Sequence, residues 1–151
     1  TECHPVAATG LKKALTKGAK LIVADPRKIR LAELADLYLP IRVGSDVALL
    51  LAMAHVIVRE GLTDQEFIAE RCAEYEAFEQ HLKEFTPAWA AEICEVPAAD
   101  IETAGLWYGK AKLGAIYYTL AITEHICGVD NVQSLCNLAR LPGTLGTAGT
   151  G

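Results

Sequence analysis

The feature that most constrains the fold is a short, uninterrupted apolar run, Leu21-Ile22-Val23-Ala24, which ends at Asp25-Pro26-Arg27. An apolar run without polar alternation is typical of a strand that is covered on both faces, as in a parallel sheet. A helical pattern over residues 5–17 precedes the run, with Pro5 suited to a first turn and Gly18 to a helix end. A helix followed by a buried strand predicts an αβ repeat.

The next segments continue this pattern. A brief helical pattern over residues 29–35 leads to a second extended stretch at residues 37–43, which Pro40 makes short or an edge strand. Gly44-Ser45-Asp46 then supplies a turn and an N-cap before an apolar helix over residues 47–59. These junctions predict a second αβ unit.

The middle of the chain interrupts the pattern. Residues 63–110 have helical character throughout and predict three or four short helices, the first of them introduced by the capping box at residues 63–66. A third strand is expected at residues 113–118 and a last helix at about residues 131–140. We therefore predict one α/β domain over residues 1–151, a Rossmann-like, mostly parallel sheet flanked by helices, with a helical insertion at about residues 63–110.

Composition excludes several classes of function. The net charge is −5 and the basic residues are scattered, which disfavours nucleic acid as a partner. No apolar run reaches the roughly 18 residues of a membrane-spanning helix, so we expect neither a membrane span nor a secretory signal in this chain. The five cysteines form no C-x-x-C pair, so we predict buried thiols, suited to a reducing or anaerobic compartment, and no metal site.

Two carboxylates stand at predicted strand ends, where open α/β sheets bind their ligands. Asp25 could accept hydrogen bonds from ribose hydroxyls, or it could simply form an Asp-Pro turn. Asp46 could accept the N1–H and N2–H donors of a guanine, or it could cap the helix that follows. The residues alone leave both pairs of alternatives open.

Other polar residues lie close to the same predicted edge. Arg27 could neutralise a small carboxylate or a phosphate, or extend into solvent. Glu2 and His4 precede the first helix and could approach a ligand there, although a lone histidine more often caps or packs. Glu124-His125 follows the expected third strand, but no nucleophile or metal partner stands at a matching spacing, so we predict no catalysis by this pair.

Taken in order, these segments resemble the family of large subunits that bind bis(molybdopterin guanine dinucleotide), formate dehydrogenases in particular. The resemblance covers essentially the whole chain. The matching pieces are Glu2-x-His4-Pro5, residues 18–27, residues 44–50, residues 54–57, residues 60–62, residues 67–71, Phe85-Thr86-Pro87 and Val96-Pro97. Since the chain opens without methionine and stops in a glycine-rich stretch, we expect an internal fragment of a larger catalytic subunit.

The resemblance implies roles for individual residues. It implies that Asp25 and Pro26 lie by the nucleotide portion of the cofactor and that Gly44, Ser45 and Asp46 receive the guanine. It implies that Glu2 and His4 line the same cradle, that Arg27 contacts the cofactor and orients formate, and that Thr123 and Glu124 approach the pyrophosphate. Two departures weaken these contacts: Glu124 replaces a glutamine, and residues 142–149 lack the asparagine and proline of the family's glycine-rich segment.

The resemblance also implies what the parent enzyme does. It would oxidise formate to carbon dioxide, or run the reverse, at molybdenum or tungsten, with an iron–sulfur cluster elsewhere in the parent. Its partners would be the rest of the catalytic subunit and redox subunits, in the cytoplasm or periplasm of a prokaryote. We expect the fragment alone to be inactive. A nitrate reductase relative, or a freestanding non-enzymatic α/β binding module, are the alternatives.

Overall fold

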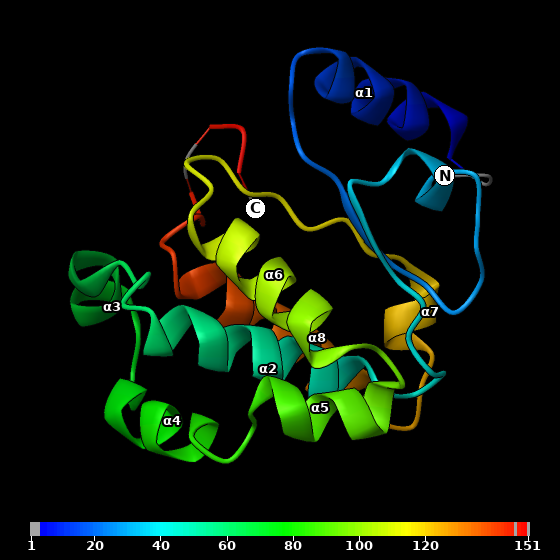
Figure 1. The fold of residues 1–151 in the computed structure, drawn as a ribbon. Helices are drawn as coiled ribbons and strands as arrows, with labels where there is room; N and C mark the ends of the chain where they lie inside the picture. Colours follow the sequence, from blue (N-terminus) through cyan, green and yellow to red (C-terminus); the bar gives the residue numbers. More distant parts are fainter. Residues whose placement is uncertain (1–3, 147, 151) are drawn as a thin grey trace. The chain divides into compact units, whose positions relative to one another are not determined.

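The computed structural model describes residues 4–146 and 148–150 and divides the chain into two compact units, residues 1–41 and residues 42–151. Figure 1 shows the elements of each unit. Whether the two units form the single domain expected from the sequence stays a prediction. None of the described helices is long and apolar enough to span a membrane.

The first unit holds the sheet. Helix α1 (Pro5–Thr16) is followed by strand β1 (Ile22–Ala24), the 3-10 helix η1 (Ala32–Leu34) and strand β2 (Leu37–Leu39). The two strands are parallel, with Val23 opposite Tyr38. Strand β2 ends where Pro40 removes a backbone donor from the ladder. The predicted α/β class and parallel pairing are confirmed, and the second strand is shorter than the predicted stretch at residues 37–43.

The second unit is helical, and its helices pack around α2 (Asp46–Arg59). The other helices are α3 (Gln65–Arg71), α4 (Tyr75–Leu82), α5 (Pro87–Cys94), α6 (Ala98–Gly109), α7 (Leu120–Thr123) and α8 (Gly128–Arg140). The apolar sequence of α2 lets it bury residues against α4, α5, α6 and α8. Helix α6 approaches closely at Gly105, where an added Cβ would lie 2.9 Å from Val56 Cβ.

The helical character predicted for residues 63–110 is confirmed, since α3, α4, α5 and α6 all lie within that range. Its first cap differs from the predicted capping box, because the helix begins one residue later than that motif requires. Asp64 is the N-cap of α3 and its Oδ1 accepts the backbone N–H of Phe67 at 2.9 Å, while Thr63 accepts from the Gln65 side chain instead. Thr86 caps α5 through Trp89 N–H at 3.2 Å.

The predicted third strand, at residues 113–118, is wrong. The segment has no regular secondary structure, no described backbone group exchanges a hydrogen bond with residues 112–118, and Tyr117 is 74% exposed. A β-strand is defined by hydrogen bonds to a neighbouring strand. The sequence Ile116-Tyr117-Tyr118 favours a β conformation, but it does not show that a neighbouring strand is available. Within the described residues the sheet has two strands.

Candidate functional site

Asp25 follows strand β1 directly and closes a tight turn. Its Oδ1 accepts the backbone N–H of Arg27 at 2.7 Å, and its own N–H donates to Leu39 O at 3.2 Å. The Tyr38 hydroxyl donates to Asp25 O at 2.9 Å, which ties the turn to β2. One carboxylate oxygen, Oδ1, therefore forms the Asp-Pro turn that the sequence offered as one alternative. The other oxygen, Oδ2, accepts no hydrogen bond from a described residue. Pro26 and Arg27 are exposed.

Gly44, Ser45 and Asp46 form the turn at the start of α2, called turn 44–46 below. Gly44 has φ +83°, and a Cβ there would meet nothing within 4 Å, so the backbone is open on that side. Ser45 is only 2% exposed, and its hydroxyl donates to Arg42 O at 2.6 Å. In this turn the serine is therefore buried, and the glycine is exposed to solvent.

Of the two alternatives that the sequence left open for Asp46, capping of a helix that begins at Val47 does not hold. Helix α2 begins at Asp46 itself and its N-cap is Ser45, whose side chain makes no capping bond because it is turned back onto Arg42. Asp46 is half-buried, and its carboxylate accepts no hydrogen bond from a described residue. A carboxylate in the first turn is favoured by the positive helix end.

The end of α5 braces turn 44–46, a connection that the sequence did not predict. Arg42 N–H donates to Cys94 O at 2.9 Å, and the Cys94 thiol donates to Ser45 O at 3.5 Å. Burial raises the pKa of the Cys94 thiol, so the thiol stays protonated and remains a donor. The prediction of buried thiols is confirmed at Cys94 and wrong at Cys136, which is exposed, while Cys72 and Cys127 are half-buried. Nothing periodic in the sequence marks the partner of Cys94, 49 residues away.

The segment at residues 119–124, called segment 119–124 below, folds into the single turn of α7 and leaves Thr123 and Glu124 exposed. Its main anchor is Asn131, a fully buried residue whose Nδ2 donates to Ile122 O at 2.8 Å and whose Oδ1 accepts the Cys127 thiol at 3.7 Å. The sequence does carry a signal for this anchor: Asn131 lies on the same helix face as Leu135 and Leu138. A carboxamide on a buried face needs hydrogen-bond partners, so this pattern could have indicated its role.

The remaining predicted residues are placed as follows. His4 is exposed and precedes α1 as its N-cap without a side-chain capping bond, and Glu2 lies outside the described residues. Asp25 and turn 44–46 belong to different units, so their convergence on one nucleotide stays a prediction. Turn 44–46 and segment 119–124 belong to the same unit, at the starts of α2 and α7.

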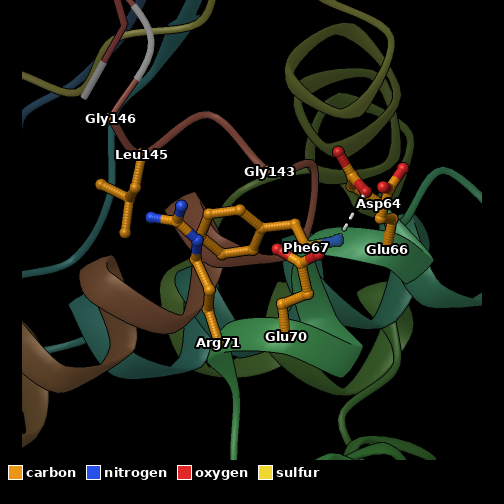
Figure 2. A pocket seen from close by; sticks show the side chains of 8 residues that line it. All are labelled: Asp64, Glu66, Phe67, Glu70, Arg71, Gly143, Leu145 and Gly146. Carbon is orange, nitrogen blue, oxygen red and sulfur yellow. Dashed lines mark hydrogen bonds between the residues drawn. The ribbon is translucent and has the colours of Figure 1, made fainter.

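A pocket of about 280 Å³ lies between α3 and the loop after α8, away from these residues. Figure 2 shows its lining residues, which are Asp64, Glu66, Phe67, Glu70, Arg71, Gly143, Leu145 and Gly146. Gly143 comes so close to Asp64 that an added Cβ would lie 2.5 Å from Asp64 Oδ2. Three carboxylates against one guanidinium repel a phosphate, so this pocket does not have the chemistry of a nucleotide cradle.

Comparison with known proteins places these features in a family. The model of the molybdopterin oxidoreductase family matches residues 1–151. The chain belongs to the molybdopterin oxidoreductase family. This confirms the resemblance on which the sequence analysis relied, and the mixed α/β structure agrees with it.

Individual family members sharpen the comparison. The chain is 42% identical to the F420-dependent formate dehydrogenase subunit alpha of Methanocaldococcus jannaschii over 150 residues, which is 99% of this chain and 22% of that protein. It is 33% identical to a nitrate reductase of Synechocystis over 99% of this chain and 21% of that protein. The solved structure of acetylene hydratase from Pelobacter acetylenicus superposes with a TM-score of 0.91 at 31% identity, covering 95% of this chain and 20% of that one.

The chain therefore spans about a fifth of the length of these family members. The predicted fragment of a larger oxidoreductase subunit is consistent with this coverage. Activity, substrate and redox partners belong to the whole subunit of such a protein, and for this chain they are matters of proposal.

Proposed function

We propose that this chain holds one guanine nucleotide arm of a bis(molybdopterin guanine dinucleotide) cofactor in a formate dehydrogenase-like parent. The observation that carries the proposal is turn 44–46. It presents an open glycine backbone, a half-buried carboxylate that accepts no hydrogen bond within the described part of the chain, and the N-terminus of a 14-residue helix at one place.

The chemistry of this turn fits a guanine nucleotide. Asp46 offers two acceptor oxygens, which match the adjacent N1–H and N2–H donors of guanine, whereas adenine presents no such pair. No described group accepts the backbone N–H of Asp46, Val47 or Ala48, and such free N–H groups bind anions. Ser45, which the resemblance assigns to the guanine, contributes through its backbone, because its hydroxyl is already bonded to Arg42 O.

The residues of the first unit would serve the rest of the ligand. Asp25 Oδ2 is available for a ribose hydroxyl, and the exposed Arg27 guanidinium would balance the negative charge of formate. His4 and Glu2 would line the cradle, and Thr123 and Glu124 would stand by the pyrophosphate. The bound metal cofactor would supply the two-electron chemistry that interconverts formate and carbon dioxide.

The 33% identity to a nitrate reductase supports a second candidate function for the parent enzyme, in which the cofactor is the same and the substrate is nitrate. The higher identity to a formate dehydrogenase subunit favours formate. The identity of the metal-ligating residue in the parent coding sequence separates the two candidates.

The test is calorimetry with guanosine and adenosine monophosphates on the chain, in the wild type and in Asp46→Asn. Asparagine has the same shape, but it places an N–H donor against the guanine donors. We expect the wild type to prefer the guanosine nucleotide and Asp46→Asn to lose about tenfold in affinity, the order of magnitude of one bidentate base contact.

Asp130→Asn is the matched control, since Asp130 is also an aspartate in the first turn of a helix, α8. It should bind like the wild type. Equal affinity of the wild-type chain for the two nucleotides, or an equal loss in both variants, would contradict the proposal.

A further inference from the structure

Three hydrogen bonds close a ring between turn 44–46 and the end of α5. Arg42 N–H donates to Cys94 O at 2.9 Å, the Cys94 thiol donates to Ser45 O at 3.5 Å, and the Ser45 hydroxyl donates to Arg42 O at 2.6 Å. Cys94 is fully buried and Ser45 is 2% exposed, so water does not compete for the thiol or for the serine hydroxyl. The ring joins parts of the chain that are 49 residues apart in sequence.

The ring determines which atoms of the turn can face a ligand. Ser45 O accepts two donors, the Cys94 thiol and Leu49 N–H at 3.1 Å, so its peptide plane is fixed from both sides. The Ser45 hydroxyl points inward. Between these fixed groups, Gly44 is exposed with φ +83°, and Asp46 follows at the helix start. The direction in which Gly44 and Asp46 face is therefore set by α5 together with the first turn of α2.

We propose that Cys94 is a positioning residue for turn 44–46. Its thiol holds Ser45 O in the orientation that presents the Gly44 backbone and the Asp46 carboxylate to a guanine. This role rests on the proposed function, because it takes the guanine nucleotide as the ligand of the turn. Cys94 itself touches no ligand and acts only through Ser45.

A thiol suits this role because it is a small apolar group that still carries a donor. Cys94→Ala keeps the bond from Arg42 N–H to the carbonyl of residue 94, and removes the thiol donor together with the volume of its sulfur. Serine keeps a donor in a smaller side chain. The pair Cys94→Ala and Cys94→Ser therefore separates loss of the donor from loss of volume.

The experiment combines amide hydrogen exchange, resolved by NMR, with nucleotide calorimetry on the full chain. In Cys94→Ala we expect exchange at the Ser45 and Leu49 amides to become at least about fivefold faster, with the amide of Ala104 in α6 unchanged. The preference for guanosine over adenosine monophosphate should fall by about fivefold, the size of one lost buried hydrogen bond. Cys94→Ser should restore both values to within about twofold of the wild type.

Val96→Ala is the matched control, because Val96 is also buried and stands two residues away, but it carries no donor. It should lower the unfolding temperature and leave turn exchange and nucleotide preference unchanged. If Cys94→Ala does not fold, the variants Cys94→Thr and Cys94→Val are compared instead. Their side chains have the same shape, and only threonine carries a hydroxyl donor.

Unchanged exchange at Ser45 and Leu49 in Cys94→Ala, or an equal increase at Ala104, would overturn the positioning role. A wild-type chain that binds both nucleotides equally would instead overturn the proposed function. The two failures are distinguishable, because the exchange measurement needs no ligand.

Discussion

Turn 44–46 and segment 119–124 both belong to the second unit, and the family resemblance assigns both to the cofactor, yet they are built differently. The turn lies against α5, with Ser45 buried and three hydrogen bonds closing a ring around it. The segment is a single helical turn with Leu120 65% exposed, held mainly by the carboxamide of Asn131. One region is braced by a ring of hydrogen bonds, and the other is attached to α8 by a few contacts, at Gly128 and Asn131.

This difference has a consequence for binding. A braced turn is ordered before a ligand arrives, so little of the binding energy is spent on fixing it. A segment that is held by only a few contacts depends on each of them, so the loss of one contact should have a large effect on its geometry. Substitutions in these contacts test the comparison directly.

The largest effect is expected from Gly128→Ala. An added Cβ would lie 2.2 Å from Thr123 O, and a backbone atom cannot move aside as a flexible side chain can. We expect a loss of about 2–3 kcal/mol in the free energy of unfolding, at the upper end for overpacked sites, measured by urea denaturation.

Gly10→Ala is the control for this substitution, because Gly10 is also in a helix but has nothing within 4 Å of an added Cβ. It should be neutral or slightly stabilising, since alanine favours a helix. If Gly128→Ala were as stable as Gly10→Ala, segment 119–124 would be free of α8 and the comparison would fail.

Asn131→Ala should have the next largest effect. It leaves Ile122 O and the Cys127 thiol without their buried partner, which costs about 2 kcal/mol of unfolding free energy. Proteolysis between residues 119 and 125 should become faster in this variant. Gln133→Ala, an exposed carboxamide on the same helix, should change neither stability nor cleavage. Equal cleavage in the two variants would show that Asn131 does not hold the segment.

The comparison also shows what the sequence can predict. Helix α1 and helix α2 are predicted to within one residue at each end, because hydrophobic periodicity and turn residues are local signals. Turn 44–46 is found by the same local logic, as a glycine between a strand and a helix. The N-cap expected within residues 44–46 is Ser45, so of the two alternatives left open for Asp46 the capping one does not hold.

What could not be predicted depends on contacts between distant residues. The strand expected at residues 113–118 has no partner among the described backbone groups, and its sequence alone could not indicate that. The bond between Cys94 and Ser45 leaves no periodic trace, since a buried cysteine resembles any small apolar residue. The sequence therefore indicates where a site residue stands, while the packing decides which of its atoms are free.

The smallest effect concerns the brace itself. Glu95 follows Cys94 in the left-handed conformation, with φ +59°, which strains any residue except glycine. Its ion pair with Arg42 is 3.8 Å long and exposed, so losing it matters little. We therefore expect Glu95→Gly to raise the free energy of unfolding by about 0.5–1 kcal/mol, and to leave proteolysis of segment 119–124 unchanged.

Glu92→Gly is the control for this prediction, and it should change the free energy of unfolding in the opposite direction. Glu92 is an exposed glutamate in the same helix, α5, but it has ordinary helical geometry, so glycine there should lower stability by about 0.5–1 kcal/mol. Two glutamate-to-glycine substitutions three residues apart should thus shift the urea midpoint in opposite directions. If both variants lose stability, the left-handed conformation of Glu95 is not a source of strain. The entropy that glycine loses on folding would then outweigh any strain released at the end of α5.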